Sequence, residues 1–369
     1  MIERDDLRAA VSAGLLTEMQ AGHLTALADA RRGTREAISP GEEPFELFRG
    51  FNEIFIVAGL LILSTGWWLM TGIAMIASDG LTGIVLMTTT GAGLVCLLSE
   101  YFIRRRRMVA PAIMLTILFT MAAATAARVV AGGAIPVLTF LDPGLGLVAI
   151  LSTIVALLGY FLRYRVPFAL ALIAILTFLA TFLVVAETTG TALTWIGLFN
   201  LAAGSAYAWA TLVLGLVVFA IAMRFDMSDP HRVTRRSANG FWLHIVAAPA
   251  IVNTMAISLL ADPTTLRLTA LAGILALLAL VALVIDRRSF LVSGAGYTVA
   301  LAGFAGSGAG IAFAILAMGA GLVLLGAAWE RIRAVLMDGL GDAIPRDRLP
   351  PAHHPDRIRT PASPPPAAR

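Results

Sequence analysis

Apolar residues form long uninterrupted runs through the middle of the chain, separated by short polar segments. A run of about 20 apolar residues is the length that an α-helix needs to cross the hydrocarbon core of a bilayer. Ten runs of this kind are present, at about 52–76, 81–103, 109–131, 144–162, 167–186, 204–223, 240–260, 266–285, 290–305 and 309–329. The pattern predicts an all-α integral membrane protein built as a bundle of about ten transmembrane helices.

One apolar stretch, residues 190–223, is too long for a single span and too short for two spans with a loop between them. Two spans here would turn the following loop, which contains four arginines, to the outside. Short loops rich in arginine stay in the cytoplasm. We therefore expect residues 191–203 to form an interfacial or re-entrant segment that carries Trp195 and Asn200, followed by one span.

The positive charges orient the predicted spans. All 27 basic residues are arginines, and four of them, Arg104 to Arg107, follow one another between the second and third spans. If this loop is cytoplasmic, every arginine except Arg128 and Arg267 falls on the cytoplasmic side of the ten-span model. Both termini are then expected to be cytoplasmic.

The two ends of the chain differ from the apolar middle. Residues 1–47 are predicted to form a small cytoplasmic helical hairpin, in which Gly14 ends the first helix and Thr17–Gln20 is a capping box for the second. A segment of this size buries little core, so it is expected to rest on the membrane surface, on cytoplasmic loops or on a protein partner. Residues 48–335 are the transmembrane domain, and residues 336–369 are a proline-rich tail predicted to be disordered.

Composition supports the membrane assignment and excludes several chemistries. Apolar residues make up 59% of the chain and charged residues 14%, with a mean hydropathy of +0.86. The absence of lysine excludes a phosphate-binding loop of the Walker type, a Schiff base and a Ser-Lys dyad. Cys96, the single cysteine, allows no intramolecular disulfide and no cysteine-based zinc site. We expect no cofactor, no nucleic-acid partner and no enzymatic activity.

Polar side chains inside or at the ends of spans are the candidates for function. The six candidates are Asn52, Glu53, Arg128, Asn200, His244 and Asn253. Asn52 and Glu53 either cap the first span at the membrane surface or take part in coupling or proton relay. Arg128 either extends to the outer interface or pairs with Glu187 or Asp142.

The predicted seventh span carries two of these candidates and a proline. His244 is either a packed, hydrogen-bonded histidine or a proton carrier. Pro249 frees a backbone carbonyl, so that Asn253 either satisfies groups at the kink or binds a ligand there. Three tryptophans at span ends are expected to be interfacial anchors: Trp195, Trp242 and Trp329.

Three segments resemble a family of bacterial polytopic membrane proteins that is known only as a domain of unknown function. They are Val11–Ala21 (VSAGLLTEMQA), Phe48–Glu53 (FRGFNE) and Phe241–Pro249 (FWLHIVAAP). The resemblance implies a bacterial inner-membrane location. It implies no catalytic or binding residues, because that family has no established activity.

Two hypotheses of function follow from the sequence. In the first, the protein is a permease for a small solute or a lipid, and substitution of His244 or Asn253 abolishes its function. In the second, it is a non-transporting scaffold or sensor, and deletion of the hairpin at residues 1–47 abolishes its function. The scarcity of charge within the spans slightly favours the second, since ion-coupled carriers usually need an intramembrane carboxylate. The ten spans, the proline-bearing seventh span and the segment around Asn200 nonetheless make transport the leading hypothesis.

Overall fold

The computed structural model describes residues 10, 13–15, 51–77, 81–131, 143–229, 235–291, 293–297, 309–341, 345 and 348–350. Every regular element among these residues is a helix. The chain divides into two compact units, Met1–Phe45 and Glu46–Arg369.

In the N-terminal unit the structure describes the point where the first predicted helix ends. Ala10 is helical, Gly14 has a φ of 71°, and the Leu15 N–H donates to the Ala10 carbonyl at 2.9 Å. This geometry is that of a helix ended by a left-handed glycine, as predicted. The second predicted helix, with its capping box at Thr17–Gln20, lies outside the described residues.

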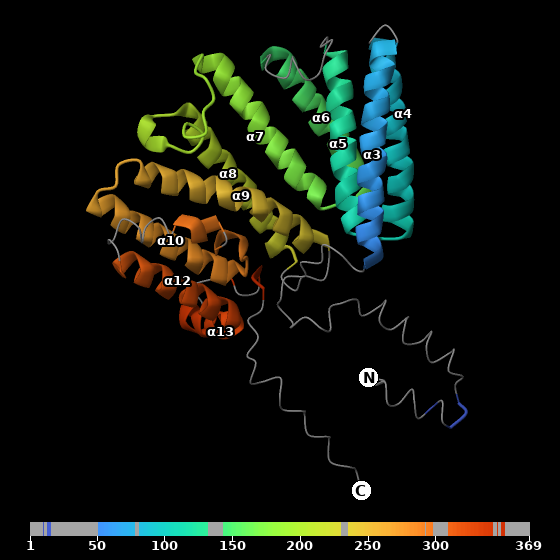
Figure 1. The fold of residues 1–369 in the computed structure, drawn as a ribbon. Coiled ribbons are helices and arrows are strands. Elements are labelled where there is room, and N and C mark those ends of the chain that lie inside the picture. The colour runs from blue at the N-terminus through green and yellow to red at the C-terminus, as the bar shows by residue number, and fades with distance from the viewer. Residues whose placement is uncertain are drawn as a thin grey trace. The chain divides into compact units, whose positions relative to one another are not determined.

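Eight helices of the described chain are long and apolar enough to cross a membrane, and each coincides with one of the first eight predicted spans. They are α3 (Phe51–Ala77), α4 (Leu81–Ser99, continued by the π-helix η2, Glu100–Arg105), α5 (Ala110–Val130), α6 (Pro143–Tyr164), α7 (Phe168–Thr189), α8 (Ala206–Met227), α9 (Arg235–Leu260) and α10 (Thr265–Ile285) (Figure 1). The protein is therefore an all-helical, multi-pass membrane protein.

The C-terminal part contains shorter helical pieces. Residues 289–291 and 293–297 are helical and belong to the ninth predicted span, whose remainder lies outside the described residues. The apolar helix α12 (Ala309–Ala327) matches the tenth. A further helix, α13 (Trp329–Leu340), includes residues 336–340, which the sequence analysis assigned to the disordered tail.

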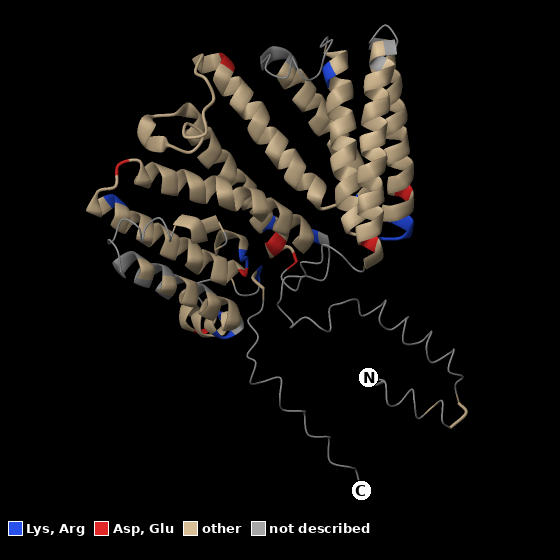
Figure 2. Ribbon diagram, in the orientation of Figure 1, with Lys and Arg blue, Asp and Glu red and all other residues tan. Residues whose placement is uncertain are grey.

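Neighbouring spans run antiparallel, so that alternate termini gather at one end, which we call the arginine end because Arg104–Arg107 lie there. Near the C-terminus of α6, Arg163 pairs at 3.0 Å with Glu100, which directly follows α4. The rings of Phe168, at the start of α7, and Trp242, near the start of α9, lie 4.7 Å apart. In the eight long apolar helices the described charges lie at or near the ends, and the middles carry none (Figure 2). We call the opposite end the far end.

Three turns at the arginine end contain a residue other than glycine in the left-handed region. These residues are Arg107 (φ 54°), Arg165 (φ 53°) and Asp286 (φ 56°), each placed just after a helix. A left-handed backbone costs a residue with a Cβ atom about 1 kcal/mol, and glycine is the usual residue there. At these three places the chain has a charged residue instead.

Small residues bring α8 and α9 close together. Ala247, Ala248 and Ala256 of α9 are completely buried. A Cβ atom added at Gly215 of α8 would lie 3.0 Å from the Cβ of Ala250. Close backbone approach through small residues is typical of helix pairs in membranes.

The ambiguous stretch after α7 contains one span in the structure. Gly190 ends α7 with a φ of 62°, residues 195–199 form turns, and the 3₁₀-helix η3 (Leu201–Ala203) leads into α8. The Leu201 N–H donates to the Ser258 hydroxyl at 2.7 Å, close to the far end of α9. This contact places the segment at the level of the helix ends.

Candidate functional site

The six candidate residues lie at separate places in the structure. Arg128 lies near the C-terminus of α5 and is 2% exposed. Glu53 contacts the opposite end of the same helix, about 27 Å away at 1.5 Å per residue. His244 and Asn253 are both on α9, about 13 Å apart along its axis. No common polar cavity is formed by these six residues in the described part of the chain.

Glu53 caps a neighbouring helix. Its side chain is 4% exposed, and its Oε2 atom accepts a hydrogen bond of 3.0 Å from the N–H of Ala110, the first residue of α5. The cap residue of α5 itself, Val109, has no side-chain group for this role. A carboxylate at a helix N-terminus satisfies a free N–H and interacts favourably with the helix dipole. The geometry thus matches the capping role, with α5 rather than α3 as the capped helix.

We expect Glu53→Ala to lower the free energy of unfolding by about 1–2 kcal/mol, the usual cost of losing an N-cap. The measurement is SDS-induced unfolding in micelles, followed by tryptophan fluorescence. Asn52→Ala is the matched control, because Asn52 is the neighbouring residue and is exposed. Equal stabilities of the two variants would contradict the capping role.

Asn200 and Asn253 also make contacts within the protein. The Asn200 Oδ1 atom accepts a hydrogen bond of 3.3 Å from the N–H of Ala203, so that this side chain caps η3. The Asn253 Oδ1 atom accepts one of 2.9 Å from the hydroxyl of Tyr297. Helix α9 continues through Pro249 between Arg235 and Leu260. Both amides therefore have structural partners.

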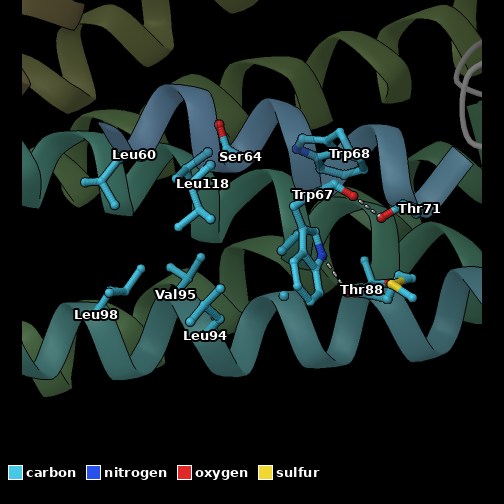
Figure 3. A pocket seen from close by; sticks show the side chains of 14 residues that line it. Leu60, Ser64, Trp67, Trp68, Thr71, Thr88, Leu94, Val95, Leu98 and Leu118 are labelled. Atoms are coloured by element: carbon cyan, nitrogen blue, oxygen red, sulfur yellow. Dashed lines mark hydrogen bonds between the residues drawn. The ribbon is translucent and has the colours of Figure 1, made fainter. Parts of the chain in front are cut away.

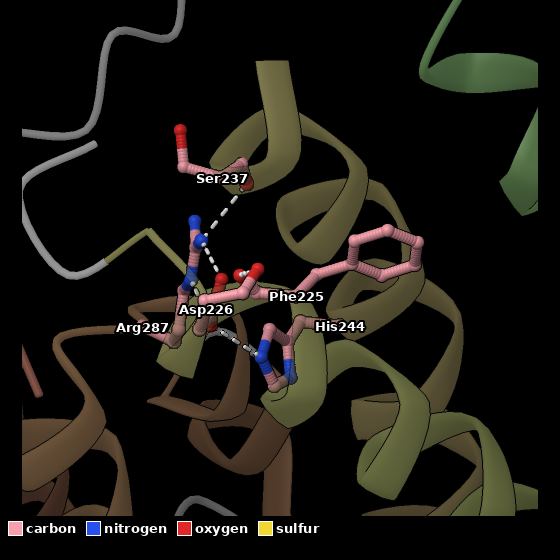
Figure 4. A network of polar contacts seen from close by, with 6 residues as sticks. Phe225, Asp226, Ser237, His244 and Arg287 are labelled. Atoms are coloured by element: carbon pink, nitrogen blue, oxygen red, sulfur yellow. Dashed lines mark hydrogen bonds and ion pairs between the residues drawn. The ribbon is translucent and has the colours of Figure 1, made fainter. Parts of the chain in front are cut away.

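His244 belongs to a buried charged cluster with Asp226 and Arg287, which we call the Asp226 cluster (Figure 4). The His244 Nε2 atom lies 2.9 Å from the Asp226 Oδ2 atom. Arg287 donates from Nε to the same oxygen at 3.0 Å and from Nη2 to Oδ1 at 2.5 Å. The three side chains are 0%, 5% and 3% exposed in the order His244, Asp226, Arg287.

Three residues on one face of α9 contact Asp226 or Arg287. The Ser237 carbonyl accepts a hydrogen bond of 3.0 Å from Arg287, and His244 contacts Asp226 (Figure 4). Between them on the same face, Gly240 lies so close that an added Cβ atom would collide with the Asp226 carboxylate. The spacing 237, 240, 244 brings all three positions to one side of a helix.

The Asp226 cluster joins three helices at the arginine end. Asp226 is near the C-terminus of α8, His244 is on α9, and Arg287 follows α10. At most 5% of each side chain is exposed, and Asp226 is bonded to both His244 and Arg287, so the charges of the cluster are compensated within the protein. Its chemistry is that of a bidentate, hydrogen-bonded ion pair that holds helix ends together.

A second buried network lies next to it. Trp329 donates from its indole N–H to the Asp286 Oδ1 atom at 2.7 Å. Arg333 of α13 donates to the carbonyl of Leu283 at 3.0 Å and to that of Pro350, so that it satisfies a carbonyl of the last turn of α10. The expectation that Trp329 is an interfacial anchor is wrong, because the residue is 4% exposed and bonded to a carboxylate.

The described chain also has an apolar groove between α3, α4 and α5, with about 550 Å³ of empty space, part of it open (Figure 3). It lies at the level of the middle of α3. The residues that line it include Leu60, Leu63, Trp67 and Trp68 of α3, Leu94, Val95 and Leu98 of α4, and Leu118 and Ala122 of α5. On α4, Gly91 leaves room for the ring of Trp67, since a Cβ atom there would lie 2.6 Å from its Nε1.

Four of the five groove side chains that carry an N–H or O–H group are bonded to backbone carbonyls, and the indole N–H of Trp68 is the exception among the described residues. The Trp67 indole N–H donates to the Met87 carbonyl at 3.0 Å, across the groove (Figure 3). The hydroxyls of Ser64 and Thr71 donate to carbonyls of their own helix at 2.8 and 2.9 Å, and that of Thr88 does the same. These donors are therefore not available to a polar ligand.

The sequence analysis did not single out Asp226 or Arg287. Asp226 lies near several arginines just after an apolar run, and a carboxylate at such a position is predicted to belong to a loop. The one usable signal was the spacing of Gly240 and His244, which leaves a small space beside a polar side chain on one helix face. It did not indicate which carboxylate fills that space.

No group of three or more histidine, cysteine, aspartate or glutamate side chains suited to hold a metal ion occurs among the described residues. Comparison with other proteins adds no assignment for the groove or for the Asp226 cluster. No family model, no curated protein and no solved structure matches the chain.

Proposed function

We propose that the protein is a lipid permease of the bacterial inner membrane, and that the groove between α3, α4 and α5 receives the hydrocarbon chain of its substrate. The observation that carries this proposal is the chemistry of the groove. Its lining is apolar, and four polar side chains in it are already hydrogen-bonded to backbone carbonyls. A polar solute would lose its hydration there and gain at most one hydrogen bond, from the indole N–H of Trp68, whereas an acyl chain would lose nothing.

The placement of the polar candidates supports a lipid over a small solute. Glu53, Asn200 and Asn253 each have a structural partner, and His244 is enclosed with Asp226. A carrier for a small polar solute needs such groups around one cavity near the membrane centre. The described residues offer an apolar groove instead.

The orientation of the protein in the membrane and its number of spans are proposed from the charges and the apolar runs. We place the arginine end in the cytoplasm, together with both termini, and take the ninth and tenth predicted spans as membrane-crossing. The helical residues 289–291 and 293–297 and the apolar helix α12 support this count.

The groove is tested by filling it. Ser64 and Thr65 are neighbours on α3, and both hydroxyls donate to the Leu61 carbonyl at 2.8 Å, but only Ser64 lines the groove. We expect Ser64→Phe to weaken chain binding about tenfold, the effect of losing two buried methylene groups. Thr65→Phe, which adds the same ring outside the groove, should leave binding unchanged.

The readout has two parts. In nanodiscs, phosphatidylcholine with a diazirine at the end of one acyl chain should label Trp67, Leu94 and their neighbours, and Ser64→Phe should remove this labelling. In liposomes, Ser64→Phe should slow the transfer of fluorescent lipid between leaflets. Even labelling around α3, including the exposed Ile62, or equal behaviour of both phenylalanine variants, would refute the proposal.

A non-transporting scaffold is the second candidate function. The observation that favours it is the enclosed Asp226 cluster, which holds three helix ends together without facing a ligand. Under this alternative, a strain that depends on this protein loses its wild-type phenotype when residues 1–47 are deleted. The same strain keeps that phenotype when it carries Ser64→Phe. The lipid permease predicts that Ser64→Phe weakens this phenotype.

A further inference from the structure

Arg128 is a buried cation near the far end of α5. Its side chain is 2% exposed, and Nε, Nη1 and Nη2 are all buried. None of the three nitrogens has a hydrogen-bond partner in the part of the chain that the structure describes. Because the side chain is enclosed, it does not lie along the lipid-facing surface as the interfacial alternative requires.

A guanidinium cannot escape this position by losing its proton, since arginine remains protonated in proteins. An unpaired buried charge is among the most destabilising features that a fold can contain. The positive charge and its five N–H donors therefore require an anion with several acceptor oxygens. Planar, bidentate recognition of phosphate or carboxylate is what arginine does best.

The chain offers limited sources of such an anion. Glu187, one of the two predicted partners, is exposed at the end of α7, and no ion pair joins it to Arg128 among the described contacts. Asp142, the other, lies outside the described residues. At the far end the structure describes one ion pair, between Arg267 and Asp262.

The N-terminus of α6 lies at the same end of the bundle as Arg128. Helices α5 and α6 are antiparallel: Tyr160, near the C-terminus of α6, stacks at 4.5 Å on Phe119 in the first half of α5. The first residue of α6, Pro143, therefore lies toward the C-terminus of α5. The first turn of a helix has backbone N–H groups without partners in the helix, and its dipole favours an anion.

We propose that Arg128 binds a phosphate group at the far end, where the N-terminal turn of α6 also lies. The group belongs either to the headgroup of an anionic lipid or to a soluble phosphate. The site is separate from the groove, because Arg128 is not among the residues that line it and lies six residues, about 9 Å, beyond the groove residue Ala122 toward the far end. Failure of the lipid permease proposal would leave this site in place.

Binding is tested on the purified full chain in detergent. Native mass spectrometry with phosphatidylglycerol and with phosphatidylcholine measures headgroup selectivity, and a thermal-shift titration with inorganic phosphate measures the response to the free anion. We expect at least about tenfold preference for phosphatidylglycerol or a shift with phosphate, which is the scale of a charge-assisted hydrogen bond. Selectivity for the lipid alone identifies the headgroup, and a response to phosphate identifies the soluble anion.

Arg128→Gln should abolish either response, and Arg128→Lys, which keeps the charge but not the planar fork, should retain part of it. Arg267→Gln is the control, because Arg267 is another arginine at the far end and is paired with Asp262 at 3.3 Å. It should behave as the wild type does.

Three results would overturn the proposal. The wild type shows neither lipid selectivity nor a phosphate response; or Arg128→Gln retains the wild-type response; or Asp142→Asn destabilises the chain as much as Arg128→Gln does, and the double variant no further. The last result would make Asp142 the anion. The first can be read even if Arg128→Gln fails to fold.

Discussion

Replacing Asp226 by leucine is expected to lower the free energy of unfolding by about 3–5 kcal/mol, the usual cost of removing one partner of a buried ion pair. Leucine has the same branched shape and number of heavy atoms as aspartate, so the substitution leaves no cavity. Arg287, which is 3% exposed, would keep its positive charge but lose both bonds to the carboxylate. The measurement is SDS-induced unfolding in micelles, followed by tryptophan fluorescence.

Two further variants show whether the effect comes from the buried pair. Asp262→Leu removes the carboxylate of an exposed pair with Arg267, whose side chains are 69% and 38% exposed, and should cost at most about 1 kcal/mol. In Asp226→Leu/Arg287→Met no unpaired charge remains, and most of the lost stability should return. If the double variant is no more stable than Asp226→Leu, the ion pair is not the source of the effect.

Gly240→Ala is expected to destabilise the protein by about 1–3 kcal/mol, although alanine is the better helix former. A Cβ atom at this position would collide with the Asp226 carboxylate and lie 3.2 Å from the Ala222 carbonyl. The carboxylate cannot move aside, because Arg287 and His244 hold both of its oxygens. The same unfolding assay measures the loss.

Gly273→Ala is the matched control for this substitution. Gly273 lies in α10, and a Cβ atom added there would meet nothing within 4 Å. Alanine at this position should raise stability by up to about 1 kcal/mol, through helix propensity alone. Two glycine-to-alanine changes in transmembrane helices are thus expected to have opposite signs. Stabilisation by Gly240→Ala would contradict this close packing, because it would mean that a Cβ atom fits between α9 and the Asp226 carboxylate of α8.

Run length and charge were enough to predict the described spans, because a bilayer imposes a fixed helix length and disfavours charge in its core. The stretch after α7 shows this most clearly. The four arginines that follow it excluded a second span there, and the structure has one, Ala206–Met227. Here the charges that follow the apolar stretch, from Arg224 to Arg236, carried more information than the stretch itself.

The pairing of polar residues could not be predicted in the same way. Asp226 and Arg287 are 61 residues apart, and Glu53 and Ala110 are 57 residues apart. Which two helix ends meet depends on packing between spans, and the sequence pattern within one span does not contain it. The cap on α5 had an additional difficulty, because capping rules refer to residues that precede the helix they cap.

The turn between α6 and α7 consists of residues 165–167 alone, and its first residue, Arg165, combines a left-handed backbone with a positive charge. So short a connection ties the two helices together during membrane insertion, and its arginine resists being translocated. We expect α6 and α7 to insert into the bilayer together, as a helical hairpin, during synthesis. Helix α7 is then in place before α8 and α9 leave the ribosome, so the core around Phe178 and Ala247 is completed by helices that arrive later, in a fixed order.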